Sequence, residues 1–237
     1  MEIFPSVYII DLALYFDSTL VIADAHIGYE GVLNRQGILI PRFQLEDMTA
    51  RMNSILRKLA HRIIDRIIIN GDLKHEFGAI SEQEWRNTLR FLDLLAKHCK
   101  EIILIKGNHD TILGPIAKKR NLRVLDNVII NDKLIAHGDK TPSKELLKKI
   151  STIIIGHEHP AISIKEGSRI ENYKCFLKGK FKSKNLIVQP SFNTIIEGTD
   201  VLRDEILSPF LQQNLGNFEV YAVADKIYKF GNLKSMK

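Results

Sequence analysis

Residues 65–75 read DRIIINGDLKH, an apolar run that ends abruptly in glycine, aspartate and histidine. We predict that Asp65–Asn70 is a strand buried on both faces, because consecutive isoleucines leave no polar side for solvent. Gly71, Asp72 and His75 follow its carboxyl end. Open α/β sheets bind ligands at the carboxyl ends of their strands. The segment therefore predicts both an α/β fold and the edge of the sheet at which a functional site lies.

The same pattern, an apolar strand followed by histidine with Asp, Asn or Gly, recurs four more times. The predicted strands are Thr19–Ala23, Glu101–Ile105, the short strands within Leu122–Ala136, and Ser151–Ile155. The clusters that follow them are Asp24-Ala25-His26, Gly107-Asn108-His109-Asp110, His137-Gly138-Asp139 and Gly156-His157-Glu158-His159. Because strand ends lie along one edge of a sheet, we expect these side chains to converge. The remaining histidines, His61 and His98, lie in helical stretches and are expected at the surface.

Amphipathic segments between the strands predict helices. Pro41–Leu59 carries apolar residues at helical spacing, with Pro41 at the first helical position. Ser81 to Glu84 forms a capping box, and the helix it starts is predicted to bury a face of Trp85, Leu89, Leu92 and Ala96. Further elements are predicted as a helix at Pro142–Lys149 and strands at Leu186–Val188 and Phe218–Val223. This alternation favours two stacked sheets with helices outside, in one domain of residues 1–237.

The composition excludes several classes of protein. Hydrophobic residues make up 45% and charged residues 26% of the 237, as in ordinary globular proteins. The longest apolar runs are far shorter than the roughly 20 residues that span a bilayer, and the N-terminus shows no signal-peptide pattern, so no membrane partner is expected. Two cysteines, Cys99 and Cys175, are too few for a disulfide framework and favour a reducing, cytoplasmic location.

The formal charge of +6 leaves two interpretations open. A basic protein is typical of nucleic-acid partners, but a lysine-rich surface also serves solubility. The segment 165–184 allows the same two interpretations, because it interleaves seven Lys and Arg residues with Tyr173, Phe176 and Phe181. Such a mixture can hold a single strand of nucleic acid. It is equally typical of a polar hairpin whose lysines protect a sheet edge, and this second interpretation is slightly favoured.

The residue types of the strand-end clusters indicate a metal centre. Imidazole with carboxylate suits manganese, iron, zinc or nickel. In an extended chain, the D-x-H spacing of Asp24 and His26 and the H-x-H spacing of His157 and His159 would point each pair to one side. The candidate ligands are Asp24, His26, Asp72, Asn108, His137, His157 and His159. Seven ligands exceed the four of a single zinc-like ion and predict two divalent ions, with Asp72 as the bridge.

Taken together, the clusters resemble the motifs of the calcineurin-like metallophosphoesterase superfamily: D-x-H, G-D-x-x-(D/H), G-N-H-(D/E), H-G and G-H-x-H, in that order. Finer similarity is to archaeal phosphoesterases, which are related to bacterial enzymes encoded beside a DNA ligase. It rests on residues 22–30, Arg35-Gln36-Gly37 with Pro41, Cys175–Lys180, Pro190–Asn193 and Glu197–Thr199. The resemblance implies a four-layer αββα sandwich that hydrolyses phosphoesters by attack of a hydroxide held between two metals.

The resemblance also implies roles for individual residues. Asp24, His26 and His159 would hold one metal, and Asn108, His137 and His157 the other, with manganese the expected ion. Asp72 would bridge. His109 would protonate the leaving oxygen, Asp110 would orient His109, and Asn108 would also contact the substrate. The expected substrate is a phosphodiester of a nucleotide or nucleic acid. Partners in DNA repair are suggested only by analogy with the bacterial relatives.

The sequence leaves open the roles of three residues and one alternative function. Arg35 is a candidate phosphate ligand or a solvated loop charge. His75 stands where many members of the superfamily have Asp or Asn, and it is expected to hydrogen-bond a metal ligand. Asn193 could line the site from a late loop. A non-catalytic metal-binding scaffold of the same fold is the alternative function, although no ligand position is lost.

Overall fold

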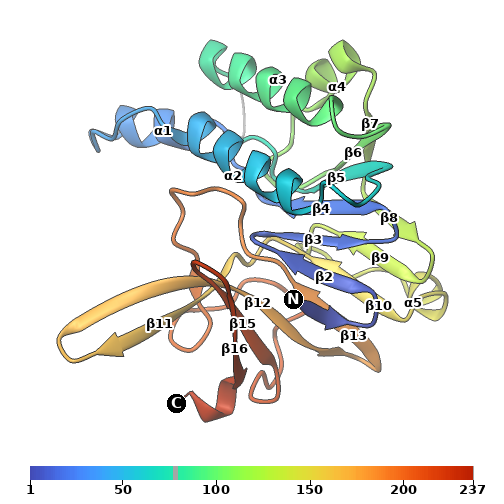
Figure 1. The fold of residues 1–237 in the computed structure, drawn as a ribbon, viewed down its shortest axis with the longest axis vertical. Coiled ribbons are helices and arrows are strands. Elements are labelled where there is room, and N and C mark those ends of the chain that lie inside the picture. Colours follow the sequence, from blue (N-terminus) through green and yellow to red (C-terminus); the bar gives the residue numbers. More distant parts are fainter. Residues whose placement is uncertain (77–79, 237) are drawn as a thin grey trace.

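Two sheets packed face to face form the centre of the computed structural model, which describes residues 1–76 and 80–236 (Figure 1). The first sheet places its strands in chain order: β1 (Glu2–Phe4), β2 (Val7–Ile10), β3 (Ala13–Phe16), β4 (Thr19–Ala23), β5 (Arg66–Asn70), β6 (Glu101–Ile105) and β7 (Arg123–Leu125). Strands β1 to β4 are antiparallel, whereas β4 to β7 are parallel. The carboxyl ends of β4, β5 and β6 therefore lie at one edge, as the sequence predicts.

The second sheet contains the remaining strands. Its main path runs β14 (Thr199–Asp200), β11 (Pro160–Glu166), β12 (Arg169–Phe181), β13 (Lys184–Val188), β10 (Thr152–Ile155), β9 (Lys133–Ala136) and β8 (Asn127–Ile130). Off this path, β15 (Glu219–Val223) pairs with β12, and β16 (Ile227–Asn232) pairs with β15. Both faces are buried, and β10 shows this clearly. Ile154 packs into the core between the sheets, while Ile153 and Ile155 pack into a second core on the outer face.

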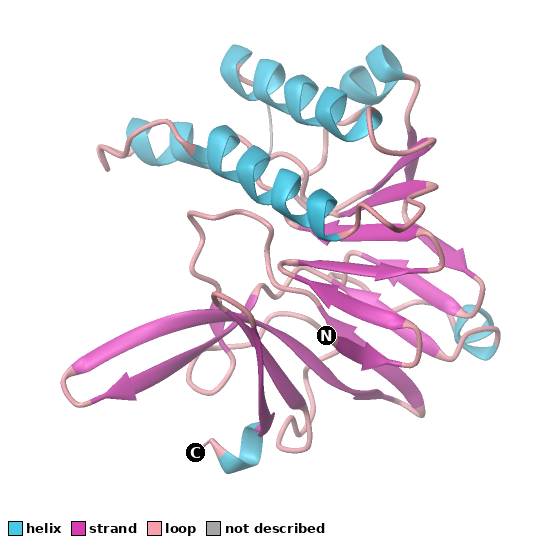
Figure 2. Ribbon diagram, viewed as in Figure 1, coloured by secondary structure: helices cyan, strands magenta, loops and turns pink. Residues whose placement is uncertain are grey.

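Helices flank the pair of sheets (Figure 2). They are α1 (Tyr29–Arg35), α2 (Gln44–Lys58), α3 (Glu82–Ala96), α4 (Gly114–Arg120) and α5 (Lys144–Lys148), followed by a 3₁₀ turn at Leu233–Ser235. α1 to α4 lie on the side of the first sheet, whereas α5 and the irregular segment 201–218 cover the second. The predicted four-layer α/β architecture is confirmed, with a thin fourth layer. No helix in residues 1–76 and 80–236 is long and apolar enough to span a membrane.

Two details of the predicted helices are wrong. α2 begins at Gln44, so Pro41 lies outside it; the first N–H is bonded instead by the Glu30 carboxylate, at 3.0 Å. In α3, Ala96 is exposed, and the buried face continues through Phe91 and Leu95. The capping box is half formed. Ser81 Oγ accepts from Glu84 N–H at 3.2 Å, but the Glu84 carboxylate turns away to another loop, described below.

Candidate metal centre

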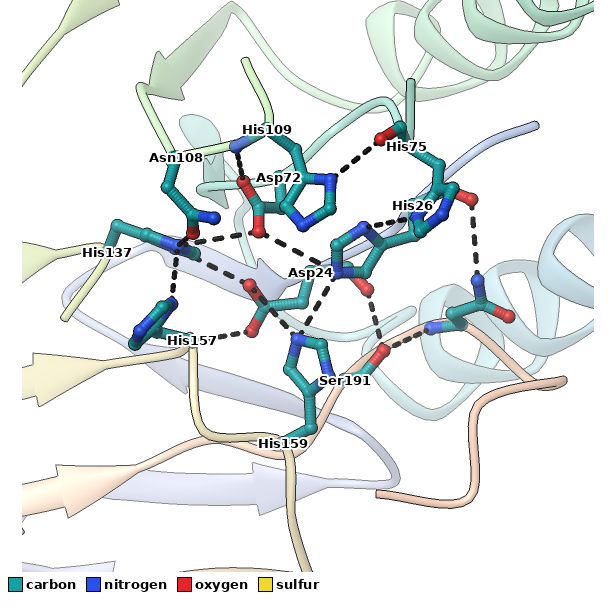
Figure 3. A network of polar contacts seen from close by, with 12 residues as sticks. Asp24, His26, Asp72, His75, Asn108, His109, His137, His157, His159 and Ser191 are labelled. Atoms are coloured by element: carbon teal, nitrogen blue, oxygen red, sulfur yellow. Dashed lines mark hydrogen bonds and ion pairs between the residues drawn. The ribbon is translucent and has the colours of Figure 1, made fainter. Parts of the chain in front are cut away.

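Side chains from five loops meet at the carboxyl edge of the strands, as Figure 3 shows. One group of donor atoms comes from the loop after β4 and the loop after β10. Nε2 of His26 lies 3.2 Å from Nε2 of His159, and the latter lies 3.6 Å from Oδ1 of Asp24. Asp24 and His26 are fully buried, while His159 is partly exposed. This group contains the three residues predicted to hold one metal.

A second group of donor atoms lies beside the first. Nε2 of His137, in the loop after β9, lies 2.9 Å from Oδ1 of Asn108 and 3.1 Å from Nδ1 of His157. Neighbouring ligands of one ion, at bonds of about 2.0–2.2 Å, are roughly 3.0–3.6 Å apart. The spacing of the donors in both groups fits this requirement, so the residues present suit divalent metals.

Asp72 lies between the two groups. Its Oδ2 is 3.7 Å from Nε2 of His26 and 3.5 Å from Nε2 of His137. Its other oxygen, Oδ1, accepts the backbone N–H of His109 at 2.8 Å. The carboxylate is therefore fixed by one oxygen and directs the other toward both groups.

The electrostatics of the site favour cations. Burial, reinforced by the Asp24 and Asp110 carboxylates, raises the pKa of Asp72 to about 9 in the protein alone. Burial also lowers the pKa of His26 well below its usual range and that of His137 to about 4. Neutral imidazoles have the lone pair that a metal needs. Two buried atoms, Oδ1 of Asp24 and Nδ1 of His137, have no hydrogen-bond partner among the described residues.

The backbone that carries these side chains differs from the extended chain expected. Asp24, His26, Asp72, His157 and His159 all have left-handed backbone conformations, with φ from 44° to 67°. Asp and His tolerate this region better than most residues. Each loop therefore turns sharply at the ligand itself. The pairs Asp24 with His26 and His157 with His159 do reach one centre, but through turns and not through strand geometry.

Close packing of the loops demands glycine beside the ligands. A Cβ at Gly107 would lie 2.1 Å from Oδ1 of Asp72, and one at Gly71 would lie 2.0 Å from Nδ1 of His137. Neither distance is sterically allowed. The glycines in the sequence clusters are thus explained by the approach of a neighbouring ligand side chain.

His109 lies next to the first group of donors, with its ring centroid 4.9 Å from that of His26. Its Nδ1–H donates to the backbone carbonyl of His75 at 2.7 Å. This contact with the ring comes from His75 and not from Asp110, which was expected to orient His109. The Asp110 carboxylate instead accepts from the backbone N–H groups of Leu73 and Gly107, at 3.3 and 3.1 Å, and so joins the two loops. Burial raises the pKa of Asp110 to about 6.

The three open residues take distinct positions. Nδ1 of His75 lies 3.3 Å from Nδ1 of His26, on the side of the ring away from the metal group. Arg35 pairs with Glu76 at 2.9 Å, next to His75, and its contact in the structure is thus a carboxylate. Asn193 does not line the site. It is buried, and its Nδ2 donates to the carbonyl of His26 at 3.4 Å.

Several supporting residues escaped the sequence analysis. Gln44 donates to the carbonyl of His26 at 2.7 Å, and Ser191 donates to that of Asp24 at the same distance. The buried Lys74 donates to the carbonyl of His109 at 2.9 Å. Glu84 accepts from the N–H groups of His75 and Glu76, at 2.9 and 3.1 Å. Glu84 carried a signal, its place in the capping box, but that signal pointed to a different contact, and Ser191 lay in a segment of the resemblance to which no role was assigned.

The basic segment 165–184 does not form one face. β11 and β12 form a long hairpin, but its basic side chains contact different partners in different parts of the structure. Lys174 turns inward to the carbonyls of Ser191 and Asn193, Lys178 pairs with Glu219 at 3.5 Å, and Arg169 pairs with Glu171. The interpretation as a polar hairpin is therefore closer to the structure, although β12 is an interior strand and not an edge.

A cavity of about 650 Å³ adjoins the second group of donors. Its lining includes Asn108 and His137 of the donor group together with Lys106, Asp126 and Asp139. Binding sites for small molecules commonly enclose about 300–1,000 Å³, so this cavity is large enough to hold part of a substrate beside the donors.

Comparisons with known proteins agree with this geometry. The structure is similar to that of nuclease MPE from Pseudomonas putida, with 19% sequence identity over 94% of each chain and a TM-score of 0.66. Weaker likenesses are to the protein AQ665 from Aquifex aeolicus (18% identity, 60% of this chain and 78% of that one, TM-score 0.38) and to Vps29 from Entamoeba histolytica complexed with zinc (16%, 90% and 98%, 0.37). No curated protein sequence matches significantly. Residues 18–214 match the model of the calcineurin-like phosphoesterase family. The chain therefore belongs to the calcineurin-like phosphoesterases, a family of metal-dependent hydrolases.

Proposed function

We propose that the protein is a dinuclear metal-dependent phosphodiesterase acting on a nucleotide or nucleic-acid phosphodiester. The observation that carries this proposal is the position of Asp72 Oδ2, within 3.7 Å of a donor in each group. Asp24, His26 and His159 would hold one ion, and Asn108, His137 and His157 the other. When bound, a pair of divalent cations supplies charge neutralisation for the phosphoryl group and lowers the pKa of a water.

The protein's own residues would do the rest. His109 stands at the rim of the donor groups, and its ring is held through Nδ1 by the carbonyl of His75. A ring fixed through Nδ1 presents Nε2 for proton transfer to the leaving oxygen. The cavity beside Asn108 would receive one ester arm of the substrate. The likeness to a nuclease supports a nucleic-acid diester, and the motif resemblance favours the archaeal branch of the family, with manganese as the expected metal.

An assay with two chromogenic esters tests the proposal. Purified protein is loaded with Mn²⁺, Zn²⁺ or Ni²⁺ and assayed on bis(p-nitrophenyl) phosphate, a diester, and p-nitrophenyl phosphate, a monoester. We expect metal-dependent turnover that favours the diester. His109→Ala should lower kcat about 10²–10⁴-fold while the metal content stays near that of the wild type. No hydrolysis by fully loaded protein would contradict the proposal and favour the non-catalytic scaffold.

The same variant tests the role of His109. If His109→Ala removes the metals, the residue is a ligand or holds one, and its assignment to proton transfer fails. Assays with mononucleotides, cyclic nucleotides and oligonucleotides then show which class of phosphoester the protein hydrolyses fastest.

A further inference from the structure

The loop between α1 and α2 exposes large apolar side chains. Ile38, Leu39 and Phe43 have exposed fractions of 51%, 86% and 56%. Single exposed apolar residues are common, but three within six positions of one loop are a concentration that points to a binding surface. We call residues 36–43 the rim loop.

The rim loop is held in a defined shape. Asn34 donates from Nδ2 to the carbonyls of Glu30 and Ile40, at 2.8 and 3.0 Å. The N–H of Ile38 donates to the carbonyl of Leu33 at 3.0 Å. These bonds close the loop on α1, so its apolar side chains stay in solvent because the backbone holds them there.

The rim loop leaves the metal-binding loop through α1 and returns to it at Gln44. α1 begins at Tyr29, shortly after the ligand His26, and a rise of about 1.5 Å per residue places its far end, where the rim loop starts, about 10 Å outward. Gln44, directly after Phe43, donates to the carbonyl of His26 and accepts from the N–H of Gly28. Figure 1 shows the rim loop projecting at the free end of the α1–α2 pair. The cavity lies against His137 and Asn108, in the other donor group.

The charge of this region suits a polyanion. The rim loop contains no acidic residue, and its Arg42 is exposed and forms no ion pair within residues 1–76 and 80–236, whereas Arg35 before the loop is paired with Glu76. An exposed aromatic ring next to arginine is the usual means of holding unpaired bases and their phosphates. We propose that the rim loop binds a single strand of nucleic acid that continues past the scissile phosphate, with Phe43 and Leu39 against the bases and Arg42 on a phosphate. This inference rests on the proposed function and adds a polymeric substrate to it.

Binding measurements test the inference separately from catalysis. Fluorescence anisotropy of labelled 20-nucleotide DNA and RNA would be recorded with Mn²⁺-loaded protein in a His109→Ala background, which slows cleavage. We expect the double variant Leu39→Ser with Phe43→Ala to weaken binding at least about tenfold. Arg42→Ala should reduce the slope of log K against log [salt] by about 0.7, the loss of one phosphate contact to a single strand. Comparing the affinities for DNA and for RNA shows which nucleic acid binds more tightly.

Two variants serve as matched controls. Ile63→Ser removes another exposed apolar residue, and Arg57→Ala another exposed arginine, both near the far end of α2. Neither should change affinity or salt dependence. Melting temperatures within a few degrees of the parent would show that all variants fold.

Other outcomes overturn the inference. Unchanged affinity in the rim-loop variants would refute it, even if the wild type hydrolyses the chromogenic diester and the proposed function stands. Light scattering that shows a dimer dissociated by Leu39→Ser, with unchanged oligonucleotide affinity, would assign the rim loop to a second copy of the chain. Failure of the loaded wild type on the diester would instead refute the proposed function.

Discussion

The backbone N–H of His109 donates to Oδ1 of Asp72 at 2.8 Å, and this bond links the residue proposed for proton transfer to the residue proposed as the bridge. Asp72 follows β5 and His109 follows β6, two parallel neighbours in the first sheet. Oδ1 accepts this bond, and Oδ2 is the oxygen that is directed at both donor groups. One interaction therefore fixes the positions of the two residues for which bridging and proton transfer are proposed.

Asp72→Asn should reduce bound metal from two ions to one or none. The amide has one oxygen, and its NH₂ group cannot bind a cation. We expect kcat on the diester to fall by at least about 10³-fold, because a single cation no longer clamps the phosphoryl group. Elemental analysis after dialysis gives the metal-to-protein ratio. Asp93→Asn, at the exposed partner of Arg120, is the control. Two ions retained in Asp72→Asn would contradict the bridging role.

Gly107→Ala should damage the site through packing alone. The added methyl would lie 2.1 Å from Oδ1 and 2.4 Å from the backbone nitrogen of Asp72, so one loop must move. Overpacking of this kind costs about 1–3 kcal/mol in the free energy of unfolding. Urea denaturation measures that cost, and metal titration measures the loss of affinity that we expect with it.

The control for this change is Gly31→Ala, inside α1, where the nearest atom to the added carbon outside the neighbouring residues and the helix backbone is Nη1 of Arg35, at 3.7 Å. Alanine inside a helix should be neutral or stabilising by up to about 1 kcal/mol. Equal metal affinity in Gly107→Ala and the wild type would show that the loops tolerate displacement.

The strand ends could be predicted because their signal is local. Apolar runs such as Ile67–Ile69, buried on both faces, must be strands of a covered sheet, and polar residues at their ends must lie at its edge. α1 and α4 escaped prediction because seven residues give too few turns for a helical period. The first three strands are short, and their turns at Ser6, Asp11 and Asp17 take left-handed conformations without glycine.

The support of the site could not be predicted, for a different reason. The roles of Gln44, Asp110 and Glu84 are set by backbone groups of loops that are distant in the sequence. Asp110 follows His109 directly, and the resemblance to the family implied that it orients the His109 ring. In the structure its carboxylate spans to Leu73, because buried N–H groups of that loop need an acceptor.

Glu84→Ala should loosen the loop that carries His75. The change leaves the N–H of Glu76 without the acceptor it has in the structure, at a cost of about 1–3 kcal/mol in the free energy of unfolding, while the N–H of His75 keeps the carbonyl of Ile27 at 3.1 Å. Faster amide hydrogen exchange at Glu76, with a smaller change at His75, would locate the effect. Glu84→Gln keeps a carbonyl acceptor and should retain most of the protection.

A matched control lies on the same turn of α3. Glu82 is exposed, and Glu82→Ala should change neither stability nor exchange at His75 by more than about 0.5 kcal/mol. If Glu82→Ala and Glu84→Ala behave alike, the effect belongs to the charge at the start of the helix and not to the hydrogen bonds with the loop.

Lys174 predicts a pH dependence of stability. Its ammonium lies against the carbonyls of Ser191 and Asn193, and burial lowers its pKa from 10.5 to about 7. Between these values the unfolded chain binds one more proton than the folded chain, so the free energy of unfolding rises with pH across this window. In Lys174→Met this position binds no proton in either state, so its contribution to the pH dependence is lost. The difference in stability, wild type minus variant, should therefore become more positive from pH 7 to pH 9.5 in urea denaturation at constant metal content.

The exposed Lys180, on the same strand β12, provides the control. Lys180→Met should leave the difference from the wild type constant across the same range, because an exposed side chain has nearly the same surroundings in the folded and unfolded states. The loss of two hydrogen bonds in Lys174→Met shifts its stability by a constant amount and leaves the slope unaffected. A pH-independent difference would therefore show that the Lys174 ammonium stays charged in the folded protein, with the two carbonyls outweighing the cost of burial.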